Sequence, residues 1–222
     1  MPQKYLNMIL NAPVYDVAHE TPLDIAPRLS EKLDNKVLIK REDLQPVFSF
    51  KLRGAYNKLI NLTNEQKKRG VVAASAGNHA QGVALAADKL NIEATIVMPQ
   101  TTPDIKIEGV KKFGACVVLY GDDFSSAFTK AQEIATKTTS VFIPPFDDPL
   151  VIAGQGTIGI ELLRQCMEDI HAIFIPIGGG GLISGIGAYV KMVRPDIKII
   201  GVESDESASM RASLEKGRRV TL

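Results

Sequence analysis

The sequence predicts an α/β protein built on a largely parallel sheet. Short apolar runs recur along the 222 residues, and several lack polar alternation, which is typical of strands covered on both faces. Stretches with helical apolar spacing separate these runs. Alternation of strands and helices favours parallel strands joined by right-handed crossovers. We expect strands at 36–40, 71–74, 94–98, 116–119, 141–143, 172–177 and 197–202.

Apolar stripes and end signals predict the helices between these strands. Residues 78–90 and 182–193 each place their apolar side chains on one helical face. Pro103 suits the first turn of another helix, and Gly114 suits the cap at its C-terminal end. A last helix is expected at 207–216.

Composition describes an ordinary globular protein and argues against several functions. The net charge is +1, with 45% hydrophobic and 23% charged residues, so nothing points to nucleic acid or to an acidic membrane surface. No apolar run reaches the length of a membrane span, and the N-terminus leads into no signal region. Cys116 and Cys166 lie far apart without metal-ligand spacing. We therefore expect no metal site and a reducing, cytoplasmic setting.

Two proline-containing breaks, at 45–46 and 144–149, divide the chain. The block between them, residues 46–149, is expected to form a small α/β domain inserted into a larger one. Residues 1–45 and 150–222 would come together as that larger domain. After its last predicted strand only one helix and a strand-like start at 220–222 follow. The sequence thus predicts a large domain that is incomplete at its C-terminal end.

The first motif that could carry chemistry is a lysine in the heptad Ser49-Phe50-Lys51-Leu52-Arg53-Gly54-Ala55. Apolar neighbours remove water from an ammonium group and lower its pKa. An amine with a pKa near neutrality suits covalent bonding to a carbonyl compound. The alternative is a lysine at a helix start that extends its charged end into solvent.

The second motif, Ser75-Ala76-Gly77-Asn78-His79, follows a predicted strand and opens a helix. Small residues at a helix N-terminus leave N–H groups free to bind an anion such as a substrate carboxylate. Asn78 suits either the helix cap, which spacing alone favours, or a hydrogen bond donated by its side-chain amide to a phenolate oxygen. His79 invites the role of a base, but a lone histidine in a first helical turn is more often structural.

The third motif, Gly178-Gly179-Gly180-Gly181-Leu182, lies between a buried strand and an amphipathic helix. Four consecutive glycines are entropically costly, so the backbone there must approach something closely. A strand, glycine loop and helix in this order favour a phosphate site. A generic tight turn is the alternative.

A fourth glycine pattern, Gly154-Gln155-Gly156-Thr157-Ile158-Gly159, matches a dinucleotide fingerprint. However, the apolar run before it is short, and the acidic residue that contacts a ribose about twenty positions further on is missing. We interpret this pattern as a glycine-rich helix start rather than a nicotinamide site.

Together the first three motifs resemble the pyridoxal-phosphate enzymes of fold type II, the tryptophan synthase β-like group. Within that group, residues 40–56 are most similar to the biosynthetic threonine dehydratases, also called threonine deaminases. Racemases and degradative members usually carry Thr-Gly-Ser-Phe-Lys at this place. The resemblance extends through 97–99, 104–106, 144–147 and 151–157.

The resemblance implies two open, mostly parallel α/β domains, with pyridoxal 5'-phosphate bound to the larger. Lys51 is implied to hold the cofactor as a Schiff base, and Asn78 to bond the phenolic oxygen of its ring. The implied phosphate-binding residues are Gly178, Gly179, Gly180, Gly181 and Leu182. The implied lining of the substrate-carboxylate pocket is Ser75, Ala76, Gly77 and His79.

The implied activity is that of an ammonia-lyase in the cytoplasm. It would convert L-threonine to 2-oxobutanoate and ammonia, the first step of isoleucine biosynthesis, in a homotetramer or homodimer. Family members also place a serine or similar residue against the pyridine nitrogen, and biosynthetic members carry a regulatory domain. No segment here matches either. Two alternatives stay open: a serine dehydratase or racemase of the same fold, and a catalytically incompetent N-terminal fragment.

Overall fold

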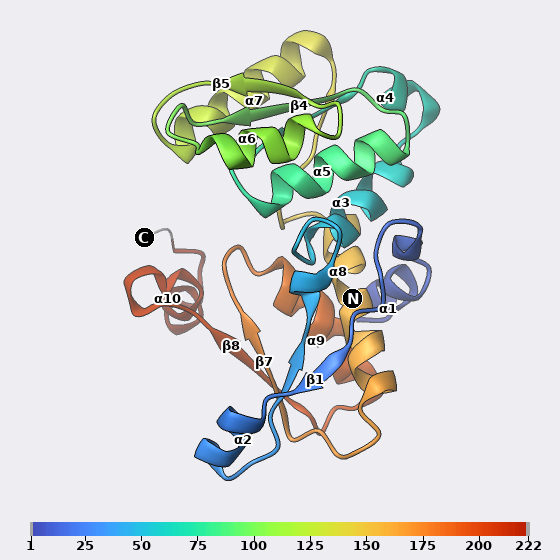
Figure 1. The fold of residues 1–222 in the computed structure, drawn as a ribbon, viewed down its shortest axis with the longest axis vertical. Coiled ribbons are helices and arrows are strands. Elements are labelled where there is room, and N and C mark those ends of the chain that lie inside the picture. Colours follow the sequence, from blue (N-terminus) through green and yellow to red (C-terminus); the bar gives the residue numbers. More distant parts are fainter. Residues whose placement is uncertain (1, 221–222) are drawn as a thin grey trace.

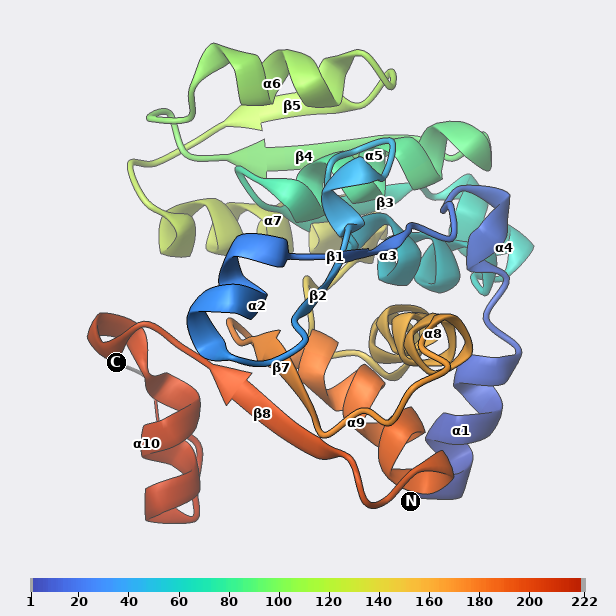
Figure 2. The ribbon, with the colours of Figure 1, turned by 60° about the horizontal axis from the view of Figure 1, so that its bottom comes forward.

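The computed structural model describes residues 2–220, which form three sheets and the helices around them (Figures 1 and 2). The strands are β1 (Leu23–Ile25), β2 (Leu38–Lys40), β3 (Val71–Ala74), β4 (Ala94–Met98), β5 (Cys116–Leu119), β6 (Val141–Phe142), β7 (Ala172–Pro176) and β8 (Lys198–Val202). The α-helices are α1 (Pro2–Leu10), α2 (Pro27–Leu33), α3 (Lys51–Ile60), α4 (Asn64–Lys68), α5 (Asn78–Lys89), α6 (Asp104–Lys111), α7 (Phe124–Thr138), α8 (Pro149–Gln165), α9 (Gly181–Val193) and α10 (Ser209–Lys216).

The sheets are mostly parallel, as the sequence predicts. The largest has the strand order β5-β4-β3-β6, and all of its pairs are parallel. Strands β7 and β8 form a second parallel pair. The exception is the antiparallel pair of β1 and β2. All seven expected strands are present with ends within two residues of the prediction, and β1 is an additional strand.

The four-stranded sheet is covered on both faces, which explains why its strands lack polar alternation. On β3, Val71 and Ala73 pack into a cluster with residues of α3 and α5. The intervening Val72 and Ala74 pack with Ala127 and other residues of α7. Because successive side chains of a strand point to opposite faces, each face needs its own apolar cover. Figure 1 shows α5 and α7 on the two sides of this sheet.

Helix α8 is the central helix of the lower half of Figure 1 and packs against α1, α3 and α9. Its contact with α3 is backbone to backbone. A Cβ added to Gly54 would lie 2.6 Å from the Val151 carbonyl oxygen, and one added to Gly154 would lie 2.6 Å from that of Arg53. Glycine at both positions therefore permits the close approach of the two helices.

The pattern 154–159 is not a helix start, contrary to the expectation from sequence, because α8 already begins at Pro149. Asp148 caps this helix, and its side chain accepts hydrogen bonds from the N–H groups of Leu150 and Val151. The remaining glycines of the pattern face other helices. A Cβ at Gly156 would meet the Ile9 side chain at 2.6 Å. The pattern thus serves helix packing.

The last elements differ slightly from the prediction. The expected helix at 207–216 is α10, which begins two residues later, after a short 3-10 turn at Asp205–Ser207. Of the strand-like start at 220–222, the last two residues lie outside the described part of the chain. None of the helices within residues 2–220 combines the length and the hydropathy that crossing a bilayer requires.

Candidate active site

Lys51 is the first residue of α3, and its amine points into the protein. The Nζ atom donates a hydrogen bond to the carbonyl oxygen of Pro145 at 2.7 Å and lies 5.6 Å from the centre of the Phe50 ring. Burial lowers the pKa of Lys51 to about 8. This agrees with the reasoning that apolar neighbours would desolvate the ammonium group, and it leaves a reactive fraction of neutral amine near pH 7.

The second motif forms the turn from β3 into α5. Gly77 occupies the cap position of α5 without a side-chain cap, so the cap that spacing favours for Asn78 is wrong. Asn78 is instead the first residue of the helix, and its amide makes no capping bond. The Ser75 hydroxyl accepts a hydrogen bond from the Gly77 N–H at 3.2 Å. The N–H groups of the first turn of α5 have no partner within the helix, as an anion site requires.

His79 is only 3% exposed and lies on the buried side of α5. Its Nε2 atom is 3.0 Å from the carbonyl oxygen of Ile143. Burial lowers the pKa of His79 to about 4, the hydrogen bond to Ile143 opposes that shift, and the charge of Lys51 adds to it. The imidazole is therefore neutral near pH 7, and Nε2 must carry the proton that it donates to Ile143.

The third motif forms the loop between β7 and α9. Gly180 has a φ of 84°, in the left-handed region that glycine adopts without strain. A Cβ at Gly179 would lie 2.2 Å from the Phe146 ring, and one at Gly181 would lie 2.9 Å from the Phe146 carbonyl oxygen. Around Gly178 there is no atom within 4 Å of such a Cβ. The glycines were expected to let the backbone approach another group closely, and at Gly179 and Gly181 that group is Phe146.

The segment 143–146, between β6 and α8, brings the three motifs together. Its Ile143 carbonyl accepts a hydrogen bond from His79, and its Pro145 carbonyl accepts one from Lys51. Its Phe146 side chain lies against the glycine loop. The family resemblance includes residues 144–147 but implies no role for them. Nothing in the sequence alone shows that two backbone carbonyls of this segment face the two titratable side chains.

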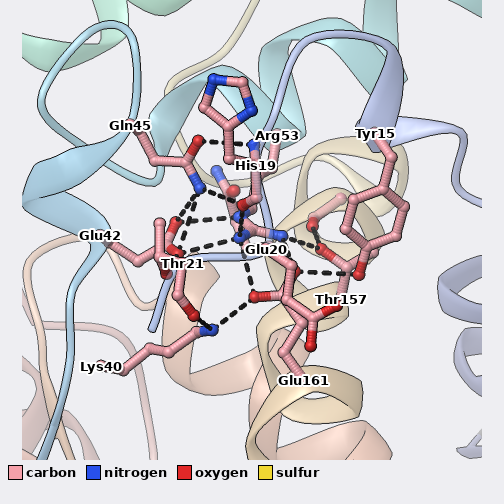
Figure 3. Close-up of polar contacts among 12 residues, drawn as sticks. Tyr15, His19, Glu20, Thr21, Lys40, Glu42, Gln45, Arg53, Thr157 and Glu161 are labelled. Carbon is pink, nitrogen blue, oxygen red and sulfur yellow. Dashed lines mark hydrogen bonds and ion pairs between the residues drawn. The ribbon is translucent and has the colours of Figure 1, made fainter. Parts of the chain in front are cut away.

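Next to Lys51 lies a buried network of charges that the sequence did not reveal (Figure 3). Arg53 and Glu161 are both 0% exposed. The guanidinium of Arg53 donates to Glu161 at 2.6 Å, to Glu42 at 2.9 Å and to the Thr157 hydroxyl at 3.1 Å. Figure 3 shows Arg53 at the centre of these contacts.

The outer members of the network complete its charge balance. The Nζ atom of Lys40 lies 2.6 Å from Glu161, and the Tyr15 hydroxyl donates to Glu161 at 2.9 Å. Two cations, Arg53 and Lys40, thus face two carboxylates, Glu161 and Glu42. Burial opposes the ionisation of Glu161, but the hydrogen bonds and charges of Arg53 and Lys40 outweigh it and keep its pKa below the usual value. Each of these buried charges thus has a partner of opposite sign, which offsets the cost of removing it from water.

The residues around Lys51 fit a phosphorylated carbonyl cofactor. Within the described residues, two buried side-chain atoms have no hydrogen-bond partner, Ser49 Oγ and His79 Nδ1. Both lie near Lys51: Ser49 is two residues before it, and the Lys51 charge acts on His79. Unpartnered buried polar atoms are rare and call for a ligand or another explanation. The glycine loop adds a left-handed turn whose backbone suits an anion. In contrast, the described residues contain no group of three or more His, Cys, Asp or Glu placed to hold a metal ion.

An α/β fold with a lysine of lowered pKa, a helix N-terminus and a glycine loop around one segment is the arrangement expected of an enzyme with a phosphorylated aldehyde cofactor. Residues 14–222 match the sequence pattern of the pyridoxal-phosphate dependent enzymes. The chain belongs to this family. Its architecture is the tryptophan synthase β-like fold of type II.

Individual relatives narrow the comparison. The chain is 58% identical over 219 residues to threonine dehydratase 1 biosynthetic, chloroplastic, of Solanum lycopersicum, covering 99% of this chain and 36% of that protein. The structure of the processed form of threonine deaminase isoform 2 from the same plant superposes with a TM-score of 0.97 at 57% identity, covering 100% of this chain and 64% of that one. Maize serine racemase gives a TM-score of 0.93 at 35% identity, covering 98% and 66%. The chain thus spans well under half of the length of the tomato dehydratase.

Proposed function

We propose that the protein is a threonine dehydratase, which converts L-threonine to 2-oxobutanoate and ammonia at the start of isoleucine biosynthesis. The observation that carries this proposal is the desolvated amine of Lys51, held by the segment that also covers the glycine loop. Identity of 57–58% to a tomato dehydratase and to a tomato deaminase supports the choice of threonine.

The residues that would hold pyridoxal 5'-phosphate are those of the three motifs. Lys51 would bind its aldehyde, and the Asn78 amide, which caps no helix, would donate to its ring oxygen. The phosphate would be bound by the N–H groups of Gly178, Gly179, Gly180, Gly181 and Leu182. When bound, the cofactor supplies a ring that accepts electrons from the α-carbon of the substrate.

The remaining chemistry belongs to the protein. The N–H groups around Ser75, Ala76, Gly77 and His79 would bind the substrate carboxylate and so orient the α-carbon toward Lys51. The amine of Lys51 would take the proton from that carbon, and its lowered pKa favours the neutral form that can accept a proton. Loss of this proton and of the β-hydroxyl together would remove one water from threonine, and uptake of one water on hydrolysis of the resulting enamine would give 2-oxobutanoate and ammonia.

A serine racemase or serine dehydratase is the second candidate, favoured by the superposition with maize serine racemase. Position 48 argues for the dehydratase. Phe48 adopts a positive φ of 57°, a conformation that glycine adopts without strain and that the Thr-Gly-Ser-Phe-Lys pattern of racemases would fill with glycine. The chain carries phenylalanine there, in the context that resembles the biosynthetic enzymes.

The test combines a spectrum with product analysis. Purified protein loaded with pyridoxal 5'-phosphate should show the visible absorbance of a lysine-bound cofactor, and Lys51→Ala should abolish it. Borohydride reduction and peptide mapping should place the cofactor on Lys51. Release of 2-oxobutanoate from threonine, faster than pyruvate or D-serine from L-serine, supports the dehydratase. Cofactor bound at Lys51 without turnover of either amino acid would contradict it and support a catalytically incompetent fragment.

Three further features are part of this proposal. We propose a large domain of residues 1–45 and 150–222 that binds the cofactor, with residues 46–149 inserted as a small domain. Assembly as a homotetramer or homodimer would be measured by native mass spectrometry. A cytoplasmic setting would be tested by fractionation, since the tomato relative is called chloroplastic.

A further inference from the structure

The imidazole of His79 forms a hydrogen bond with the same chain segment that holds the Lys51 amine. Its Nε2–H group donates to the Ile143 carbonyl at 3.0 Å. Two residues further along the chain, the Pro145 carbonyl accepts the Lys51 amine at 2.7 Å. His79 and Lys51 thus hold two carbonyls of one short segment.

The chain between these two carbonyls has little conformational freedom. Residues 144 and 145 are both proline, so their φ angles are fixed near −65° and neither has an N–H group to anchor it. On its N-terminal side the segment is fixed by the Ile143 N–H, which donates to the Val72 carbonyl at 2.8 Å. The position of the Pro145 carbonyl therefore depends on how firmly Ile143 is held.

The packing of α5 on α3 places His79 where it can act. Gly82 lies three residues after His79, on the same face of α5. A Cβ at Gly82 would lie 3.0 Å from the Lys51 carbonyl carbon. This face of α5 therefore packs against the backbone of Lys51, so His79 and Lys51 lie on two helices in close contact.

We propose that His79 is a positioning residue for Lys51. Its Nε2–H group fixes the Ile143 carbonyl, the two prolines relay this position, and the Pro145 carbonyl then holds the Lys51 amine where the cofactor aldehyde must reach it. The catalytic meaning of this contact depends on the proposed function, but the contact itself does not.

The two ring nitrogens of histidine allow a matched pair of variants. The amide nitrogen of glutamine extends about as far as Nε2, and that of asparagine about as far as Nδ1. In His79→Gln the donor to Ile143 is kept, and in His79→Asn it is too short to reach. Both substitutions introduce the same amide group, and they differ from each other by one methylene.

The first measurement uses purified protein without cofactor or substrate. Hydrogen exchange of peptides covering 139–148 should be faster in His79→Asn than in the wild type, and unchanged in His79→Gln. The second measurement is the apparent dissociation constant of pyridoxal 5'-phosphate, from the visible absorbance of the lysine-bound cofactor. It should rise about ten-fold in His79→Asn, which corresponds to the loss of one buried hydrogen bond, while His79→Gln stays near the wild-type value.

A third variant keeps the proposal testable should His79→Asn fail to fold. Pro144→Ala leaves His79 and Ile143 intact but frees the backbone between the two carbonyls, so it should also weaken cofactor binding. Equal losses in His79→Gln and His79→Asn, or wild-type behaviour of His79→Asn or Pro144→Ala, would overturn the proposal. Because the exchange experiment needs neither cofactor nor threonine, its outcome is independent of whether the protein proves to be a dehydratase.

Discussion

The guanidinium of Arg53 forms two hydrogen bonds with the carboxylate of Glu161, at 2.6 Å and 3.0 Å, and neither side chain is exposed. Arg53 stands two residues after Lys51 on α3, and Glu161 stands on α8. The α3 helix has no side-chain cap at its start. The ion pair therefore helps to hold the first turn of α3, which carries the reactive lysine, against α8.

Removal of Arg53 should destabilise the protein strongly. In Arg53→Met the carboxylates of Glu161 and Glu42 lose their buried partner, and breaking a buried ion pair from one side costs about 3–5 kcal/mol. Denaturant unfolding at pH 7 measures this loss. Arg211 provides the control, since it pairs with Glu215 on the exposed face of α10, and Arg211→Met should leave the midpoint unchanged. Equal midpoints for Arg53→Met and the wild type would contradict the assigned role.

The deficit of Arg53→Met should shrink in acid. In the wild type the pKa of Glu161 is held below its usual value, so its ionised form stabilises the fold above the ordinary carboxyl pKa, and this contribution is lost as the pH falls through the lowered pKa. In the variant, Glu161 keeps only Lys40 as a cationic partner, and protonation removes a buried charge that has lost its main partner. The difference between the two unfolding free energies should therefore be largest near pH 7 and smaller near pH 4. A difference that grows in acid would argue against an ionised Glu161.

The contact of α3 with α8 should tolerate no side chain at Gly154. In Gly154→Ala the new methyl group would lie 2.6 Å from the Arg53 carbonyl oxygen, and such overpacking costs about 1–3 kcal/mol. Gly187, in the middle of α9, is the matched control because its nearest neighbour would be 3.9 Å away. Gly187→Ala should stabilise the protein by up to about 1 kcal/mol, the difference in helix propensity. Thermal unfolding of both variants would show opposite shifts, and a stable Gly154→Ala would disprove the close approach.

Apolar patterns in the sequence predict most strands of the fold, but they do not predict which partner approaches a glycine. The strands of the four-stranded sheet were predictable because apolar runs such as Val71–Ala74 must be covered on both faces. In contrast, the pattern around Gly154 was placed at a helix start, since spacing shows that glycine is needed but not which partner approaches it. The β1 strand was missed because three residues, Leu23–Ile25, carry too little periodicity.

Some features of the candidate site could be predicted from the sequence, and others depend on the fold. Lys51 was predictable from its own apolar neighbours, and burial does lower its pKa. The cap assigned to Asn78 was wrong because Gly77, next to it, takes the cap position, a choice that depends on backbone angles. Glu161 went unnoticed as the partner of Arg53, since 108 residues separate them. Local chemistry can be inferred from local sequence, but pairs that the fold creates cannot.

The lowered pKa of Lys51 should appear in its reactivity. In protein without cofactor, acetylation of Lys51 should rise with pH around a midpoint of about 8, below the ordinary lysine value of 10.5, because burial disfavours the ammonium form. Peptide mapping by mass spectrometry measures the rate at this residue, and exposed lysines in the same digest correct for reagent decay. Bound pyridoxal 5'-phosphate should protect Lys51 alone. A midpoint near 10.5 would show that the amine is solvated.

The same shift should make stability depend on pH. Because the folded pKa of Lys51 lies below the unfolded value, the unfolded chain binds more protons between about pH 8 and 10.5, and the unfolding free energy gains a rising contribution across this window. Lys51→Met should lack this rise and should be more stable than the cofactor-free wild type at pH 7, by about 1–3 kcal/mol. Parallel pH profiles for the two proteins would contradict this account.

Phe48 lies three residues before Lys51 and combines a left-handed backbone with solvent exposure. Its φ is 57° and its side chain is 72% exposed. A residue with a Cβ loses about 1–2 kcal/mol in this conformation, and an exposed ring recovers little by packing. Phe48→Asn should therefore raise the unfolding free energy by about 1 kcal/mol, since asparagine accepts the left-handed region more readily. Phe174→Asn is the control: that phenylalanine is also exposed, at 66%, but stands on strand β7, where asparagine is disfavoured. Equilibrium unfolding should shift upward for position 48 and not for position 174, and a loss of stability in Phe48→Asn would show that the ring packs against something the fold requires.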